Sequence, residues 1–592
     1  MNLKFWSTTI ILMLLMRQNI CLFAQDIKTL NENNISVSWE QAIYWYGHLD
    51  SIHNNAKLIQ VGGTDVGKPL HLFIISEGGL FEPDQIKKQK KLVVFINNGI
   101  HPGEPDGIDA SIRLSTQLLS PKAKSPKDIV ICIIPVFNVD GSLNGGCCTR
   151  ANQNGPINQG FRGNARNLDL NRDFIKCDSE NARSLARIFR SWDPDVFIDT
   201  HVSNGADYQH VMTLISTQHD KLGGEAGRYL KSTFTPALFK AMKKRGFPMA
   251  PYVSTKKYDT PPENGIYGFM ETPRYSTGYA ALYSSFAFVT ETHMLKPFPK
   301  RVEATLALLE EFIRFSEENK DSILEIRKAT RSYFMKADSM SLEWKVDTNQ
   351  VEMVEFDGYE PVYRKSEVTG LEQLYYNRNE PFSRKIPFFD RYIGNNKVII
   401  PEFYILPQAW REIVERMNLN QVKMYRLAND TVLDLSAYQI GSYKTSSNPY
   451  EGHYIHSETE ITEQIQKIRL FAGDYFIPVD QPSCRYIVET LEPKGPDSFF
   501  SWGFFDSILQ QKEWFSAYVF DGMASEILAK NQELNERFQR KKSEDSKFAS
   551  SSFDQLYFIY KNSEWFENLN RYPVYKLGKG IHSDLIDKQL IK

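Results

Sequence analysis

Lys91-Leu-Val-Val-Phe-Ile96 and His101-Pro-Gly-Glu104 together organise this sequence of 592 residues. The first segment is a short apolar run rich in β-branched residues, which predicts a buried strand. The second lies in the following loop, and apolar residues recur at helical spacing just after it, in 106–119. A histidine and a glutamate three residues apart at the carboxyl end of a strand can converge on one zinc ion. The alternative is a helix N-terminus whose acidic residue complements the dipole, beside a solvated histidine.

Other apolar runs repeat this alternation of strand and helix. Candidate strands are 72–75, 92–96, 129–134, 196–198 and 286–289, and helical patterns occupy 106–119, 179–190 and 224–245. Continuous apolar strands between helices predict a mixed, mostly parallel sheet covered by helices on both faces. We therefore expect an α/β fold whose ligands bind outside the carboxyl ends of the strands.

Ionisable side chains follow three of these strands directly. In chain order they are His101 and Glu104, then His201, then Glu291. Because parallel strands end at the same edge of a sheet, we expect the four side chains to project from one edge. Two histidines, one glutamate and a further glutamate match a catalytic zinc site, with three protein ligands and a general base. The alternative is a separate structural role for each residue.

A polar, arginine-rich segment precedes the helical pattern 179–190. It reads Phe161-Arg-Gly-Asn-Ala-Arg-Asn-Leu-Asp-Leu-Asn-Arg-Asp-Phe174. A guanidinium can bind a carboxylate through two hydrogen bonds, so these arginines suit a substrate carboxylate. The alternative is a surface loop whose arginines pair with Asp169, Asp173 and Asp178.

Taken together, these segments resemble the zinc carboxypeptidases of the carboxypeptidase A type. The matching motifs, in the order of the family, are His101-Pro-Gly-Glu104, Asn138-Val-Asp-Gly141, Arg162 in Phe-Arg-Gly-Asn, Leu168-Asp-Leu-Asn-Arg172, His201 in Ile-Asp-Thr-His and Glu291 in Phe-Val-Thr-Glu-Thr-His. The distance along the chain from Glu104 to His201 is also typical of the family. The resemblance covers roughly residues 40–325, and the remainder resembles the extra region of long, multi-domain bacterial members.

The resemblance implies a zinc centre with one ion per chain. Its ligands would be His101, Glu104 and His201, a set that is a known property of carboxypeptidase A and is taken from the family. Glu291 would be the general base that takes a proton from the zinc-activated water and passes it to the leaving amine.

The resemblance also implies the groups that hold the substrate. Arg162 would stabilise the oxyanion, and Asn171 and Arg172 would bind the terminal carboxylate. Spacing does not place the phenol with which the family covers its substrate. Tyr275 and Tyr279 are the candidates, Tyr275 first, with packing as the alternative for both. No residue identifies the preferred C-terminal side chain.

The implied activity is that of a zinc metallocarboxypeptidase acting on a peptide or acyl-amino acid with a free carboxylate. One alternative is a zinc amidase or deacylase that cleaves N-acyl amino acids or cell-wall peptides. Another is a catalytically silent binding protein whose C-terminal half is the working part, although retention of every ligand and of Glu291 speaks against it. The net charge of −2 and the lack of a basic stripe argue against a nucleic-acid partner. The oligomeric state is left open.

Residues 1–24 are predicted to be a signal peptide, which implies a secreted or periplasmic protein. Lys4 precedes an apolar run, and Cys21-Leu-Phe-Ala24 resembles a cleavage site. The alternatives are an uncleaved anchor and a lipidated Cys21, but a run of about 12 apolar residues is too short for a bilayer of ~30 Å. No other apolar run reaches ~18 residues, so no membrane span is expected after cleavage. An odd number of cysteines then remains, and Cys147 or Cys148 could pair with Cys177.

The sequence divides into a catalytic domain at 25–330 and a C-terminal α+β region of unknown role at 345–592, joined by a charged connector at 323–345. In the C-terminal region we expect short strands within 351–398, a helix at 410–419, antiparallel strands within 465–491 and one amphipathic helix at 518–540. The aromatic segment 495–505 could form a recognition surface, but we favour the interpretation that it belongs to the hydrophobic core.

Overall fold

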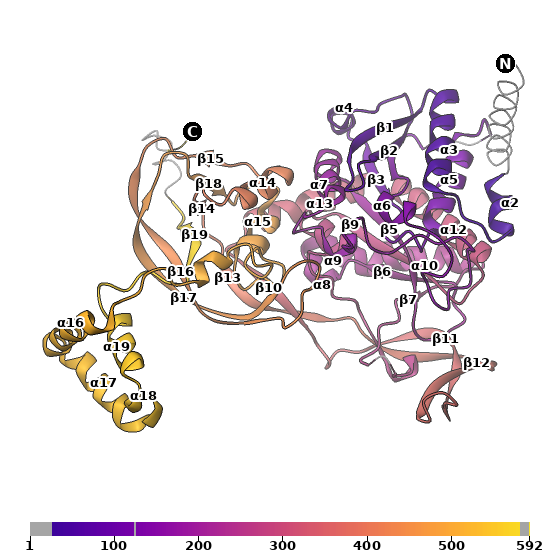
Figure 1. The fold of residues 1–592 in the computed structure, drawn as a ribbon. Helices are drawn as coiled ribbons and strands as arrows, with labels where there is room; N and C mark the ends of the chain where they lie inside the picture. Colours follow the sequence, from indigo (N-terminus) through magenta and orange to yellow (C-terminus); the bar gives the residue numbers. More distant parts are fainter. Residues whose placement is uncertain (1–25, 123–125, 258, 581–590, 592) are drawn as a thin grey trace, which may run out of the picture.

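The computed structural model describes residues 26–122, 126–257, 259–580 and 591 (Figure 1). The predicted signal peptide, 1–24, lies outside these ranges. A large sheet organises the first half of the chain. Its strands in spatial order are β1 (Ala56–Gly63), β2 (Pro69–Ser76), β4 (Ile129–Ile134), β3 (Leu92–Asn97), β5 (Val196–Ser203), β9 (Phe286–His293), β6 (Met212–Ser216) and β7 (Ala250–Pro251). The central strands β4, β3, β5 and β9 are parallel, whereas β2 and β6 run against them. The predicted mixed α/β sheet is confirmed.

One face of this sheet is covered by long helices. They are α3 (Trp39–Ile52), α5 (Asp106–Leu119), α10 (Thr235–Lys244) and α12 (Phe298–Glu318). Helix α3 begins after Ser38, which forms a capping box with Gln41. Arg301 of α12 forms two hydrogen bonds to Asp106 of α5, at 2.9 and 3.1 Å, with both side chains buried. Removing either partner of such a pair costs about 3–5 kcal/mol.

The other face is covered by α7 (Glu180–Trp192), α11 (Ser276–Ala281) and the C-terminal region. Helix α7 begins at Ser179, whose hydroxyl accepts from the amide of Ala182. Phe189 of α7 belongs to the same buried cluster as Tyr486 and Trp502 of the C-terminal region. Burying one such aromatic or aliphatic side chain contributes roughly 1.5–3 kcal/mol. The two halves of the chain therefore share one core on this face.

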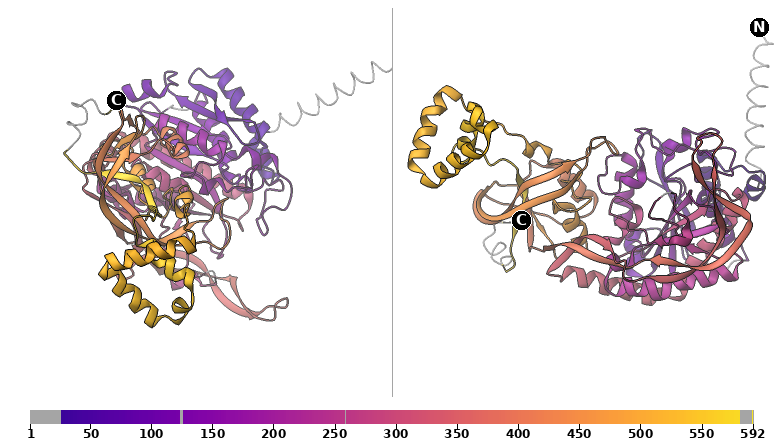
Figure 2. Two further views of the ribbon diagram at one scale, coloured as in Figure 1. Left: turned by 60° about the vertical axis from the view of Figure 1, so that its left-hand side comes forward. Right: turned by 90° about the horizontal axis from the view of Figure 1, so that it is seen from below.

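The C-terminal region is built on an antiparallel sheet. Its strands in spatial order are β15 (Tyr425–Arg426), β18 (Tyr475–Pro478), β14 (Phe403–Leu406), β19 (Arg571–Leu577), β16 (Thr431–Thr445) and β17 (His456–Leu470). Strands β10 (Ser339–Val346) and β13 (Tyr392–Ile399) form a separate pair. A long hairpin of β11 (Glu352–Lys365) and β12 (Glu372–Phe389) runs back along the first half and pairs with β8 (Ile266–Tyr267) (Figure 2).

A group of short helices lies apart from the rest of the molecule (Figures 1 and 2). It comprises α16 (Ala517–Lys530), α17 (Gln532–Glu544), α18 (Ser546–Ser550) and α19 (Ser552–Lys561), and we call it the helical module. Its own core contains Phe520, Phe538 and Tyr560. The predicted single helix at 518–540 was wrong, because Asn531 leaves the helical conformation and its side chain caps α17 by accepting from Leu534.

Other expectations for the C-terminal region had mixed outcomes. The helix predicted at 410–419 is confirmed as α14 (Arg411–Leu419). The connector at 323–345 was wrong, because α13 (Lys320–Met335) and β10 occupy it. The strand predicted around 485–490 is instead α15 (Cys484–Leu491), buried at every position. A short apolar run does not distinguish a buried strand from a buried helix. The strands within 351–398 are long rather than short.

The structure also tests the predictions for the aromatic segment and for the cysteines. Phe499, Phe500 and Trp502 of the aromatic segment are fully buried, which confirms it as core. Cys177 is buried and free, while Cys147 and Cys148 are exposed and free, so neither of the two possible pairings with Cys177 is formed. Within the described ranges we find no helix whose length and apolar character would let it cross a membrane.

Candidate active site

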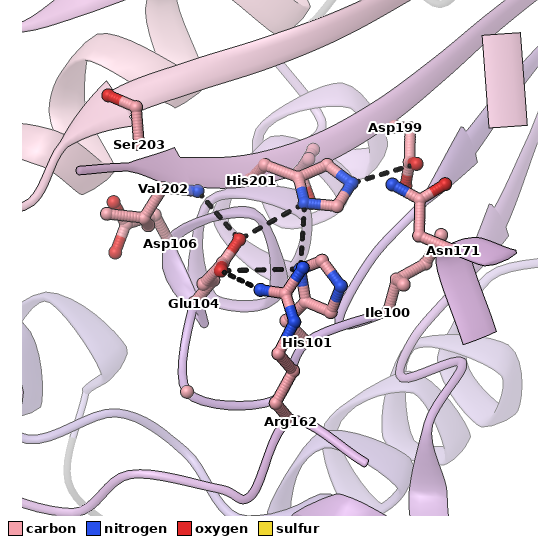
Figure 3. Close-up of polar contacts among 12 residues, drawn as sticks. Ile100, His101, Glu104, Asp106, Arg162, Asn171, Asp199, His201, Val202 and Ser203 are labelled. Atoms are coloured by element: carbon pink, nitrogen blue, oxygen red, sulfur yellow. Dashed lines mark hydrogen bonds and ion pairs between the residues drawn. The ribbon is translucent and has the colours of Figure 1, made fainter. Parts of the chain in front are cut away.

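Three potential metal ligands meet at the carboxyl ends of β3 and β5 (Figure 3). His101 and Glu104 lie in the loop between β3 and α5, and His201 lies within β5. One ligand atom from each lies within 4.8 Å of the other two. All three side chains are buried, with 3–5% of their surface exposed. The loop and the parallel strand thus bring together residues that are about a hundred positions apart.

The donor atoms face one another at short range. The two Nδ1 atoms of His101 and His201 are 3.1 Å apart, and Nδ1 of His201 is 3.1 Å from Oε2 of Glu104. Nδ1 of His101 is 3.3 Å from Oε1 of Glu104. Two nitrogens and a carboxylate directed at one point are the nitrogen and oxygen donors that zinc takes in catalytic sites.

The partners of the outer ring nitrogens show that these residues fit a cation. Nε2 of His101 is 3.0 Å from Oδ1 of Asp169, and Nε2 of His201 is 2.9 Å from Oδ2 of Asp199. We assign the proton to Nε2 in both rings, because a carboxylate can only accept. Both Nδ1 atoms then direct lone pairs at each other and at Glu104. This arrangement is repulsive without a cation, and it matches the carboxylate–histidine–zinc pattern.

The carboxylate of Glu104 is held in its ionised form. Burial raises its pKa, but the positive charge of Arg150 opposes burial, and the pKa lies well below the usual range. The backbone N–H of Val202 also donates to Oε2, at 2.9 Å. Glu104 therefore meets the requirement that a metal ligand be deprotonated.

Glu291 lies beside this cluster on the neighbouring strand. In the parallel pairing of β5 with β9, its Cα is the partner of His201. The residue is half-buried, but its Oε2 is a buried atom, and within the described part of the chain this oxygen has no hydrogen-bond partner. Burial of the carboxyl group raises the pKa of Glu291 to about 8. A carboxyl group with its pKa near neutrality is suited to accept and return a proton.

One cavity of about 290 Å³ connects the residues for which the sequence predicted a role, except the second candidate phenol, Tyr279. Its wall contains His101, Glu104, Arg162, Asn171, Arg172, His201, Tyr275 and Glu291. A larger cavity of about 770 Å³ lies at the opposite ends of the strands, where Asp193 and Asp195 pair with Arg327. The group of residues that could hold a metal lines the smaller cavity, so we place the candidate site there.

Asn171 and Arg172 lie side by side in a short 3₁₀ turn, η1 (Leu170–Arg172). The side chain of Asp169 caps this turn by accepting from the amide of Asn171 at 2.9 Å. Oδ1 of Asn171 accepts from the backbone of Ser276 at 3.1 Å, which leaves the Nδ2 group to donate to a ligand. Arg172 donates through one terminal nitrogen to the carbonyl of Asn171, at 2.9 Å.

The two candidate phenols have different surroundings. Tyr275 lines the cavity, and its ring centroid lies 4.4 Å from the guanidinium carbon of Arg172. Tyr279 is fully buried, and its hydroxyl donates to Asn420 at 2.6 Å. Tyr279 is therefore a core residue, whereas Tyr275 is in position to contact a ligand.

Two arginines reach Glu104, and the sequence predicted only one of them. Arg162 is 45% exposed and lies 3.4 Å from Oε1 of Glu104. Arg150 lies closer, at 2.5 Å from the same oxygen, and also donates to the carbonyl of Val202 at 3.0 Å. Arg150 also packs against Gly103, where an added Cβ would lie 2.9 Å from Cγ of Arg150, a contact that the sequence does not reveal. Arg150 itself comes from an irregular loop with no periodic pattern.

Comparison with known proteins finds similarity to carboxypeptidases. Residues 44–204 match the family model described as zinc carboxypeptidase. Carboxypeptidase 2 of Trichophyton equinum is 21% identical over 433 residues, covering 70% of this chain and 74% of that protein. Carboxypeptidase 2 of Trichophyton rubrum is 20% identical over 438 residues, with the same coverage of 70% and 74%. The family resemblance expected from the motifs is confirmed for residues 44–204, a range that contains the three candidate ligands and ends before Glu291.

Among solved structures, the carboxypeptidase A from Helicoverpa armigera aligns with a TM-score of 0.37 and 13% identity, covering 49% of this chain and 75% of that chain.

Proposed function

We propose that this protein is a zinc-dependent metallocarboxypeptidase that removes the C-terminal residue of peptides. The observation that carries the proposal is the meeting of His101, Glu104 and His201 at one buried point, with both outer ring nitrogens directed at carboxylates. The match of residues 44–204 to the zinc carboxypeptidase family supports the class of enzyme.

In this proposal the three clustered residues hold the metal, and Asp169 and Asp199 keep both imidazoles in the form that presents Nδ1. A zinc ion bound there would supply Lewis acidity towards the scissile carbonyl and lower the pKa of a water. Glu291 receives the proton of that water at Oε2, the buried oxygen that has no partner among the described residues, and returns it to the leaving amine.

The arginines of the cavity divide into two proposed tasks. Arg162 and Arg150 both lie beside Glu104, so their positive charge faces the place where the carbonyl oxygen becomes negative. Arg172 and Asn171 lie further along the wall, where a guanidinium and an amide can bind the terminal carboxylate of the substrate. Tyr275 covers Arg172 and would contact the same residue of the substrate.

Digestion of a peptide library with mass readout, with and without a chelator, tests the proposal. We expect loss of single residues from free C-termini, abolition of this activity by the chelator, and recovery when zinc is added. Activity confined to N-acyl amino acids, with intact peptides untouched, would instead assign the site to the amidase or deacylase alternative.

Export is a further part of the proposal and rests on residues 1–24 alone. A short positive segment, an apolar run and a small-residue cleavage site predict removal of this segment and a secreted or periplasmic location. N-terminal sequencing of the native protein should begin near Gln25. An intact Met1 in the mature protein would contradict this.

A further inference from the structure

A turn from the C-terminal region lies against the wall of the candidate active site. It connects β16 to β17 and comprises Tyr450, Glu451, Gly452 and His453. The backbone N–H of Tyr450 donates to the carbonyl of His453 at 2.7 Å, and the reverse bond is 3.1 Å. Glu451 and Gly452 have φ values of +51° and +83°, the pattern of a type I′ turn. Glu451 thus adopts a backbone conformation that is uncommon for residues other than glycine.

Each end of this turn touches the segment that carries the proposed carboxylate site. Nε of Arg172 donates to the hydroxyl of Tyr450 at 3.1 Å. The backbone N–H of Asp169 donates to Oε2 of Glu451 at 2.7 Å. His453 binds Asp178 at 2.6 Å, further along the same segment. These contacts join residues that are 275–282 positions apart.

The hydroxyl of Tyr450 is itself firmly positioned. Its ring stacks on the fully buried Trp502, with centroids 6.1 Å apart and planes 22° apart. The guanidinium of Arg274 lies over both rings, at 5.5 Å from Tyr450 and 4.9 Å from Trp502. Nε of Arg274 donates to Asp497 at 2.6 Å. Tyr450 is therefore positioned by Trp502 of the C-terminal region and by Arg274 of the first half of the chain.

The consequence is that Arg172 is oriented from three sides. Tyr450 holds Nε, the carbonyl of Asn171 holds one terminal nitrogen, and the ring of Tyr275 stacks on the plane of the guanidinium. The turn also fixes Asp169, whose side chain orients Nε2 of His101. A guanidinium oriented in advance loses less entropy when it binds a carboxylate than a free one does.

We propose that the turn Tyr450–His453 is a positioning element of the carboxylate site, so that recognition of the substrate's C-terminus depends on the C-terminal region. This inference rests on the proposed function, since it assumes that Arg172 binds the terminal carboxylate. Tyr450 and Glu451 are positioning residues, because they act through Arg172 and Asp169.

Binding measurements on a form that does not turn over test the proposal directly. In zinc-loaded Glu291→Gln protein, calorimetry gives the Kd of an N-acetylated dipeptide with a free C-terminal carboxylate and the Kd of its C-terminal amide. We expect Tyr450→Phe to reduce the preference for the acid by ~5–20-fold, because a hydrogen bond to a charged group is lost. The Kd of the amide should change by less than about twofold. In the Arg172→Ala background, Tyr450→Phe should cause no further loss.

Tyr454→Phe is the matched control, since it removes a hydroxyl from the same connection at a side chain that is 52% exposed. It should leave both Kd values unchanged. If Tyr450→Phe weakens acid and amide equally, or leaves the preference intact, the positioning role is overturned while the proposed function stands. If the parent binds acid and amide equally, the proposed carboxylate site fails and the inference fails with it.

Substitution of Glu451 provides a second, independent test that keeps the turn intact. Glycine suits the left-handed backbone of this position, so Glu451→Gly removes the carboxylate without strain, whereas Glu451→Gln keeps an oxygen that can accept from Asp169. We expect Glu451→Gly to weaken zinc binding ~3–10-fold in a chelator competition and Glu451→Gln to stay near the parent value. Equal zinc affinity in all three proteins would remove Glu451 from the proposal.

Discussion

The sheet that carries the candidate metal centre and the sheet of the C-terminal region differ in how their strands are buried. Strands β3 and β4 are buried at every position, whereas β16 and β17 mix buried and exposed positions. Parallel strands enclosed on both faces end inside the molecule, where ionisable groups lose water and their pKa values shift. The antiparallel hairpin of the C-terminal region ends instead in a turn that reaches across to its neighbour. The first architecture provides reactive groups, and the second provides contacts that orient them.

The largest loss of activity is expected from a substitution on the parallel sheet. Glu291→Gln should lower kcat by on the order of 10³, because the amide cannot accept a proton and general-base catalysis is worth 10²–10⁴. Zinc content should be unchanged, since Glu291 is outside the proposed ligand set. Stopped assays on a short peptide, with metal analysis of the same sample, check both statements. Equal turnover in parent and variant would remove Glu291 as the base.

Arg172→Ala should affect recognition more than chemistry. Loss of a charged, bidentate partner for a carboxylate should raise KM for peptides with a free C-terminus by about 10²-fold. The matching C-terminal amides should be affected much less, since they lack the charge that Arg172 pairs with. Steady-state kinetics on paired acid and amide substrates measure the difference. A variant that retains the full preference for the acid would contradict the assignment.

The sequence predicted the groups on the parallel sheet because each follows a buried strand directly. His101, His201 and Glu291 all come after apolar runs, and parallel strands bring such positions to one edge. Arg150 could not be predicted in this way. It reaches Glu104 from an irregular loop, 46 positions away, and no periodicity constrains where that loop returns.

The C-terminal region was harder to predict for a related reason. Local pattern identified α14 but not α15, since a run buried on all sides has no polar face to reveal its period. The contacts of Tyr450 and Glu451 depend on how two sheets dock, and they span about half of the chain. Single-sequence reasoning therefore identifies the candidate ligands and the proposed base, and misses the groups that tertiary docking brings to them.

Arg150→Ala tests whether a group that the sequence did not reveal still matters to the site. Arg150 holds Oε1 of Glu104 at 2.5 Å, and removal of a partner that orients a metal ligand typically costs ~10–100-fold in metal affinity or activity. We expect a loss in this range, visible as weaker zinc retention against a chelator. Arg150→Lys keeps the charge but not the second hydrogen bond to Val202, so it should recover part of the loss. Unchanged zinc affinity in Arg150→Ala would assign the residue to packing.

The smallest effect is expected from the part of the C-terminal region that does not touch the site. The helical module has its own core, and its two ends meet where the amide of Lys512 donates to Glu567 at 2.5 Å. Because this contact runs to the side chain of Glu567, residues 513–566 can be replaced by a short glycine-serine linker between Lys512 and Glu567, ahead of β19. We expect kcat/KM on short peptides to change by less than about twofold, because distant sites with no shared partners act independently. Together with the loss expected for Tyr450→Phe, this outcome would locate the contribution of the C-terminal region in one turn. A fall of more than about tenfold would instead show that the whole region acts as a unit on the site.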